Sequence, residues 1–400
     1  MKRLTLLLLG LALGVTATAK AQGLTMQMSN GWSFAFAGNV NVFWSFTKQN
    51  TLAGDAANSS IRTGLLPTFA TFDAKGKEGG MNLGIHFGFA PQIQNGGVHD
   101  NFGNGTQAGA QIDMRQVYLT LGLKNGSQIL AGRELGLFGR QNILNDMTLF
   151  GVGAVGIGQG QGSGTTLGRI GFGYIYPNFN AQVTYSTKPG QSQFSVGIFQ
   201  PSTLGGGGFV FTSVPRVEAE FTYNQRSGRN NYMFWAGGLW QTAKNAPTGG
   251  QSVSSFGGTA GVKAGLSDLT VTVSAYIGKA LGTTLMFSGA EVGAVDPTKG
   301  KSSDGGYAQL MYKVGAKTNI GASWGFSRLK NTTAGDGNQH VISNNYAYTV
   351  GVYHQWTKSV KFVVEGTQEG TTGNTAGPIL AGLPHGAKQT DLSAGFMLFF

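Results

Sequence analysis

The chain has 400 residues and no cysteine, and only 11% of its residues are charged, against about 25% in an average soluble domain. The absence of cysteine excludes a fold held by disulfides, and the scarcity of charge argues against an ordinary soluble domain. The formal net charge of +11 comes from cations that are scattered along the chain. This scatter argues against nucleic-acid binding and favours a general preference for anions.

The first residues have the pattern of a secretory signal peptide. Lys2 and Arg3 precede an apolar stretch at 4–15, and Ala19-Lys20-Ala21 forms a small-x-small cleavage site. The apolar stretch is too short for a spanning helix, which needs about 20 residues. We therefore predict a signal peptide at 1–21 and a mature chain at 22–400, with a retained membrane anchor as the alternative.

The first predicted strand covers 32–46, WSFAFAGNVNVFWSF. Its even positions carry mostly large apolar side chains, whereas its odd positions are mainly Ser, Ala and Asn. A soluble strand with such a face would need a second layer to cover it. We predict instead that the even-numbered residues face lipid and the odd-numbered residues face a water-filled lumen.

The same alternation recurs to the end of the chain, at 81–89, 217–223, 269–277, 320–326, 346–356 and 392–400. Segments of about 10 residues with one apolar face, separated by turn residues, are typical of transmembrane β-barrels. Short connections alternate with long ones, and the long ones fall at 48–62, 91–111, 140–166, 281–304, 330–344 and 369–386. A soluble β-sandwich or propeller is the main alternative and has no reason to alternate in this way.

The candidate strands come to an odd number, whereas single-chain bacterial barrels have an even one. Counting back from Phe400 makes 200–214 an outer loop, and counting forward from Trp32 makes it a periplasmic turn. We predict an all-β fold, a single antiparallel barrel of 16 strands that spans the membrane, with no further domain. A barrel of 18 strands, with an extra strand in 283–292, is the alternative.

Three stretches resemble the general porins of Gram-negative outer membranes. Residues 115–140, RQVYLTLGLKNGSQILAGRELGLFGR, are similar to the fourth and fifth porin strands, and 168–187 are similar to the segment after the third loop. The second match rests on Tyr174, Pro177, Asn178, Phe179 and Tyr185. The end of the chain, QTDLSAGFMLFF, is similar to the C-terminal porin strand, in which Phe396, Leu398 and the terminal Phe400 would be read by the barrel-assembly machinery.

The resemblance implies a homotrimeric channel in outer-membrane lipid, through which small hydrophilic solutes or ions diffuse passively. A third loop would fold into the lumen and narrow it, with wall arginines facing loop acids. By position, the wall cations would be Arg115, Arg133 and Arg169, with Arg140 at the base of the loop. The acids would be Asp146 and, near it, Glu134. The loop departs from the family pattern, because it has one acid and many glycines, which points to a weaker transverse field and a wider or more mobile constriction.

The alternation of apolar residues predicts where two of these arginines point. The apolar positions at 170–176 would direct Arg169 to the lumen. Around Arg115, apolar residues from Val117 onward share its parity, so either a bulge intervenes or the lipid-facing set starts at Tyr118. An arginine on the lipid face at the bilayer midplane costs about 2–4 kcal/mol, which favours the inward assignments.

The strands whose parity can be assigned place more cations than acids in the lumen. The cations are Arg169, Arg216, Lys263, Lys313 and Lys361, and the acids are Glu218, Glu220 and Glu365. A cationic lumen with low-dielectric walls concentrates anions, and salt screens this effect. We therefore predict a weak anion preference that fades as the salt concentration rises.

Two short motifs match enzyme signatures without the context that those signatures need. GVGAVG at 151–156 matches the dinucleotide fingerprint but lies in no βαβ unit, and GASWG at 321–325 matches a nucleophile elbow but places Ser323 in mid-strand. The five histidines have no metal-ligand spacing. We therefore expect no enzyme, no catalytic residue, no metal and no cofactor. The alternatives are an adhesive or structural barrel and a hydrolase embedded in a barrel.

Overall fold

The computed structural model describes residues 23–51, 53–93, 112–158, 165–288, 291–333, 342–373 and 386–400. The predicted signal peptide and parts of several predicted loops lie outside these residues. The described helices are short: α1 (Arg140–Leu144), η1 (Met147–Phe150) and η2 (Gly205–Gly207). None of them combines the length and the apolar character that crossing a bilayer would require.

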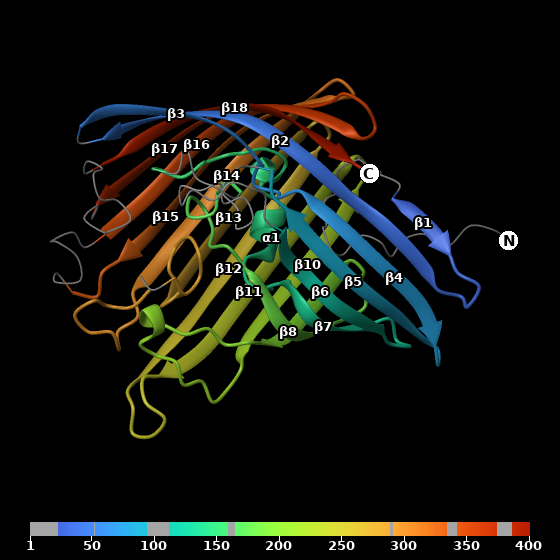
Figure 1. Ribbon diagram of the computed structural model, residues 1–400, viewed down its shortest axis with the longest axis horizontal. Coiled ribbons are helices and arrows are strands. Elements are labelled where there is room, and N and C mark those ends of the chain that lie inside the picture. Colours follow the sequence, from blue (N-terminus) through green and yellow to red (C-terminus); the bar gives the residue numbers. More distant parts are fainter. Residues whose placement is uncertain are drawn as a thin grey trace, which may run out of the picture.

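The strands form one antiparallel sheet that closes into a barrel of sixteen strands (Figure 1). The ring closes where β18 (Lys388–Phe399) pairs with β2 (Ser33–Thr51). The remaining ring strands are β4 (Phe69–Glu78), β5 (Met81–Pro91), β6 (Ile112–Gly122), β7 (Gln128–Leu135), β8 (Phe179–Ser186), β9 (Ser192–Phe199), β10 (Arg216–Ser227), β11 (Asn230–Lys244), β12 (Ser252–Leu266), β13 (Leu269–Lys279), β14 (Ser302–Val314), β15 (Thr318–Lys330), β16 (Ile342–Gln355) and β17 (Val360–Gly373). The predicted fold class and strand number are confirmed.

Two further strands, β1 (Leu24–Gln27) and β3 (Gly54–Arg62), pair with β2 outside this ring. β3 pairs with residues 43–51 of β2, and β4 pairs with residues 33–39, so that one edge of β2 is covered by two strands in succession. The prediction of a long loop at 48–62 is therefore wrong. Its polar composition resembles a loop, but backbone pairing continues to Thr51 and resumes at Gly54.

The direction of the strands settles the side on which 200–214 lies. Residues 200–215 connect β9 to β10 at the same end of the barrel as the other long connections, as counting from Phe400 predicts. The surplus candidate strand falls at 165–178, which forms turns and isolated bridges. The described part of 283–292 likewise forms no strand, so the eighteen-strand alternative has no support.

The side chains of β2 alternate between the two faces of the wall as predicted. Asn39, Asn41 and Ser45 are buried inside the barrel, whereas Val40 and Trp44 are exposed on its outer surface. The outer face of β18 follows the same rule, with Leu392, Phe396 and Leu398 exposed. The odd-in, even-out assignment of the opening stretch is therefore confirmed. That the assembly machinery reads the terminal strand stays a prediction.

Spin labels at positions 40 and 41 should report opposite environments. Val40 is 44% exposed and Asn41 is fully buried, so a lipid-soluble quencher should reach a label at 40 and not one at 41. Electron paramagnetic resonance of each labelled protein in bilayers measures the difference. Equal quenching at both positions would contradict the register of β2, because a slip of one residue turns every side chain to the other face.

Candidate pore

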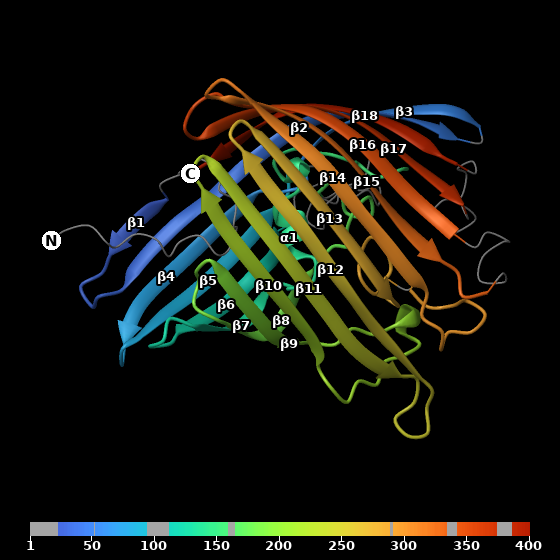
Figure 2. The same ribbon diagram turned by 180° about the vertical axis from the view of Figure 1, so that it is seen from behind.

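The connection between β7 and β8 spans residues 136–178, and its described parts, 136–158 and 165–178, lie inside the barrel. Its helix α1 stands between the two walls in both views (Figures 1 and 2). Its described residues contact the inner faces of strands from β10 round to β18. Near its start, the Asn142 side chain meets Trp235 and Thr259, and the Gln309 side chain bonds the backbone of Met147. We call this segment the third loop.

Buried carboxylates of the wall accept hydrogen bonds from backbone N–H groups of the third loop. Glu365 accepts from Val152 and Gly153 at 2.6 and 2.7 Å. Three further pairs repeat the arrangement: Phe138 with Glu218 at 2.9 Å, Gly156 with Glu369 at 2.9 Å, and Val155 with Asp391 at 3.2 Å. All four acids are at most 2% exposed. Successive N–H groups in a turn form a concave anion site, which here is filled by the protein's own carboxylates.

Glycines of the GVGAVG motif bring the loop backbone close to these acids. A Cβ at Gly151 would lie 2.1 Å from a carboxylate oxygen of Glu365. Gly153 has a φ of +58°, and a Cβ there would lie 2.6 Å from the Cα of Gly168. These glycines are therefore needed for close packing. The expectation that such glycines make the constriction more mobile does not fit the burial of Gly151 and Gly153.

Arg169 lies in the third loop and is fully buried, so its predicted place on the pore wall is wrong. Its guanidinium donates to the Ser323 hydroxyl and, at 2.9 Å, to the Ala347 carbonyl. The error arises because 165–178 is not a strand, and strand parity cannot be applied to a folded loop.

Asp146 is also buried, 4% exposed, and does not face the cavity. It caps η1 by accepting from the backbone and hydroxyl of Thr148, and it accepts from the Tyr174 hydroxyl at 2.9 Å. Burial raises the pKa of this carboxyl, and the charge of Arg169 together with three hydrogen bonds opposes the rise. The two charges stabilise the loop from within and form no field across the lumen.

A second inward segment, residues 63–68, separates β3 from β4 and meets the third loop. The backbone of Leu65 donates to the Gly151 carbonyl at 2.9 Å, and that of Thr166 donates to the Gly64 carbonyl at 3.3 Å. The Asn41 side chain completes the contact, since it accepts from the Gly64 backbone and donates to the Leu66 carbonyl. Strand pairing along β2 is therefore interrupted between β3 and β4, where the backbone of Gly64 and Leu65 bonds the third loop instead.

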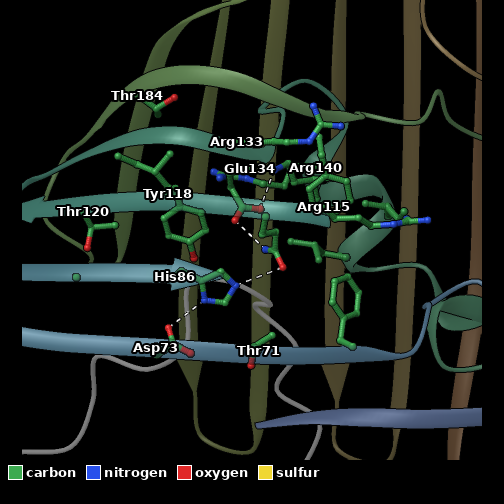
Figure 3. Close-up of a pocket in the computed structure, with 18 of the residues that line it drawn as sticks. Thr71, Asp73, His86, Arg115, Tyr118, Thr120, Arg133, Glu134, Arg140 and Thr184 are labelled. Carbon is green, nitrogen blue, oxygen red and sulfur yellow. Dashed lines mark hydrogen bonds and ion pairs between the residues drawn. The ribbon is translucent and has the colours of Figure 1, made fainter. Parts of the chain in front are cut away.

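The remaining lumen is a cavity of about 1420 Å³ beside the third loop (Figure 3). Its wall is formed mainly by inward residues of β2 and of β4 to β9, together with Lys361 of β17 and Phe399 of β18, and the third loop forms the facing side. Four of the predicted site residues line it: Arg115, Arg133, Glu134 and Arg140. The described residues therefore leave an open space along one half of the barrel.

A β-bulge turns Arg115 toward this cavity. Phe89 pairs with Met114 and Gly88 with Gln116, so Arg115 is an extra residue in β6. Its guanidinium bonds Asp113 at 2.9 Å and the Tyr176 hydroxyl at 3.3 Å. Of the two predicted alternatives, the bulge is confirmed.

Arg140 and Glu134 are both held by neighbours, whereas Arg133 is exposed. Arg140 begins α1 and forms two bonds with Glu220 at 2.6 and 3.2 Å. Glu134 accepts from the Gln116 amide at 2.8 Å and from the backbone of Leu135 at 2.7 Å. Glu134 lines the cavity and Asp146 is buried in the third loop, so the two acids do not both face the lumen as the resemblance implied.

No protein-family model matches the chain, and no curated protein matches it by sequence. Solved structures do match. The outer membrane channel DcaP of Acinetobacter baumannii has a TM-score of 0.64 and 15% identity over 94% of this chain and 99% of that one. An anion-selective porin from Comamonas acidovorans has a TM-score of 0.61 and 14% sequence identity over 92% of this chain and 100% of that one. A trimer form of OmpT, an outer membrane protein of Vibrio cholerae, has a TM-score of 0.53 and 13% sequence identity over 92% of this chain and 100% of that one.

The fold is that of the outer-membrane porins. Within this porin fold, the third loop covers half of the eight charges that strand parity assigns to the lumen. Glu218, Glu220 and Glu365 bond the loop, and Lys263 donates to Asn145 within it. Of the eight charges counted from the sequence, only Lys361 lines the cavity. The count from strand parity was therefore wrong, because parity shows which face a residue is on and not what covers that face.

Sequence reasoning missed a polar chain that crosses four strands of the porin wall (Figure 3). Asp73 bonds His86 at 3.0 Å, and the other ring nitrogen of His86 lies 3.4 Å from the amide oxygen of Gln116. Gln116 in turn donates to Glu134, and the Tyr118 ring stacks on His86 at 4.8 Å. The lumen parity of His86 was visible in the sequence, but strand register decides which residues become its partners.

Replacing Glu365 by Ala should loosen the third loop without unfolding the barrel. Two buried N–H groups would lose their acceptor, at about 1–3 kcal/mol each. Hydrogen exchange of residues 151–156 should become about 30-fold faster or more. Glu365→Gln is the matched control, because its amide oxygen can still accept and the increase should be smaller. Unchanged protection in Glu365→Ala would contradict the proposed anchoring.

Proposed function

We propose that the protein is a passive diffusion channel for small hydrophilic solutes and ions across the outer membrane. The observation that carries this proposal is a closed barrel of sixteen strands with a cavity along one half of its interior. Barrels of 16–18 strands are wide enough to leave an aqueous channel, whereas barrels of about 8 are filled by side chains. The likeness to solved outer-membrane porins supports the same conclusion.

We propose a non-enzymatic role, and the surroundings of Ser323 support it. In a nucleophile elbow the serine is exposed, with a base beside it. Here Ser323 is 8% exposed and bonds the Arg169 guanidinium, which cannot act as a base. An adhesive or structural barrel remains the alternative, and it would conduct no ions.

We further propose that the third loop limits flow and that the channel works as a homotrimer. The loop covers the inner faces of β10 to β18, and its Leu144, Phe150 and Leu167 line the cavity. The trimer is supported by the similar OmpT structure, which was solved in a trimer form.

Deleting residues 151–162 should raise single-channel conductance and admit larger solutes. Its described residues, 151–158, bond the inner faces of β17 and β18, so the deletion should widen the lumen while the strands still pair. Planar-bilayer recordings measure the change. Deleting 246–250, in the connection between β11 and β12, is the control and should leave conductance unchanged. A closed barrel that conducts no ions in either form would contradict the channel, and unchanged conductance after the first deletion would contradict only the role of the loop.

The charges that line the cavity support a weak anion preference. The cations are Lys75, Arg115, Arg133, Arg140, Lys188 and Lys361, and the acids are Asp73, Asp113 and Glu134. Arg115 and Arg140 are ion-paired, with Asp113 and Glu220. The others give the cavity a positive excess that should attract anions at low salt. Charges further apart than about 8 Å are screened at physiological salt, so the preference should be modest.

Replacing Arg133 and Lys361 together by Glu should reverse this preference. The double change leaves four cations against five acids around the cavity. Reversal potentials across a KCl gradient should shift from weakly anion-selective to cation-selective, and the shift should shrink as salt rises. Lys48→Glu is the control, because Lys48 lies on the outer face of β2. A cation preference in the unmodified channel would show that the acids outweigh the basic side chains.

A further inference from the structure

The outer surface of the barrel has a groove between β15 and β16 with a volume of about 500 Å³. It is lined by Trp324, Phe326, Arg328, Asn344, Tyr346 and Tyr348. β14, β15 and β16 lie side by side in the wall nearest the viewer in Figure 2. The groove faces away from the lumen, so the channel proposed above does not use it.

The lining of the groove changes from aromatic to charged along the strands. Three cross-strand pairs follow one another toward the long loops: Trp324 with Tyr348, Phe326 with Tyr346, and Arg328 with Asn344. Trp324 and Tyr348, the pair farthest from the long loops, are 41% and 53% exposed, so this end of the groove offers aromatic rings to an apolar ligand. Aromatic side chains of this kind lie at the membrane–water boundary in outer-membrane barrels. The order of the three pairs matches a ligand with an acyl part and a polar headgroup.

The charged end holds two cations side by side on one acid. Asp304 of β14 bonds the guanidinium of Arg328 and lies 3.3 Å from the Lys330 ammonium. The side chains of Arg328 and Lys330 remain 42% and 44% exposed, whereas that of Asp304 is 18% exposed. Lys279 lies in the same cross-strand row as Lys330, with Ser302 between them. Three cations against one acid leave a positive excess that fits an anionic headgroup.

Ring contacts fix the shape of the groove. The Arg328 guanidinium lies over the Phe326 ring at 5.1 Å, which directs the cation over the aromatic floor. On the other side, a Cβ at Gly370 would lie 2.4 Å from the Tyr346 ring, so glycine at that position lets the ring lie flat along β17. The groove is therefore shaped by packing among its own side chains and those of the neighbouring strand.

We propose that this groove binds a phosphorylated glycolipid of the outer leaflet, with its phosphate on Arg328 and Lys330 and an acyl chain on the rings. Long loops of outer-membrane barrels are extracellular, which places the charged end at the headgroup level of that leaflet. Guanidinium groups bind phosphate oxygens through paired hydrogen bonds, and an ammonium adds a point charge. Partner proteins are a less suitable occupant, because the aromatic end of the groove lies on the outer surface of the wall, on the membrane side of the charged end.

Native mass spectrometry of the full-length barrel in detergent, titrated with diphosphoryl lipid A, tests the proposal. The unmodified protein should retain lipid A, and Arg328→Gln with Lys330→Gln should weaken binding about tenfold or more, since a hydrogen bond to a charged group contributes about 1.5–3 kcal/mol. Lys48→Gln is the matched control, because Lys48 is also an outward cation paired with an acid, Asp55. Tyr348→Ala should weaken binding independently, and millimolar inorganic phosphate should not displace the lipid.

Two results would overturn the proposal. Equal retention of lipid A by the double variant and by Lys48→Gln would remove the role of the two cations. Displacement by inorganic phosphate alone would identify a simple anion site. Single-channel conductance should be the same in all these variants, so failure of the lipid site is distinguishable from failure of the channel function.

Discussion

The pairing of buried wall carboxylates with backbone N–H groups of the third loop determines the rest of the interior. Glu218, Glu365, Glu369 and Asp391 stand on three strands and are almost inaccessible to water. A buried ionised acid is costly unless it is hydrogen-bonded, so each acid needs the loop as much as the loop needs the acid. Because these partners line one half of the barrel, the loop is drawn to that half and the cavity is left to the other.

The same constraint explains the composition of the loop. A segment that bonds carboxylates through its main chain must bring that chain very close, and only glycine fits at Gly151 and Gly153. Of the three charges that the loop carries, Asp146 and Arg169 act on each other inside it, and Arg140 pairs with Glu220 of the wall. The loop therefore resembles a packed core that happens to lie within a lumen. The polarity of the pore is determined outside the loop, by Arg115, Arg133 and the lysines that line the cavity.

The two faces of the sheet differ in the side chains that they present, apolar and aromatic outside and polar inside. On the outer face, the pairs of β15 and β16 run from rings to cations, as a lipid requires at the edge of a bilayer. On the inner face, Asp73, His86, Gln116 and Glu134 form a chain across four strands that leaves few of their polar groups unpaired. One alternation of side chains therefore produces both an apolar exterior and a polar interior.

The sequence by itself determined the all-β barrel and the parity of β2 and β18, because a period of two and alternating loop lengths are local features. It favoured sixteen strands but left eighteen open, and the folded structure decided between them. It also named both possibilities at Arg115, of which the bulge proved right. It could not place Arg169, Asp146 or the wall acids, since no local pattern reveals that 165–178 folds as a loop or that Glu365 is covered by Val152 and Gly153. Those positions depend on contacts between residues about 200 apart in the chain, for which the folded backbone must first bring the two together.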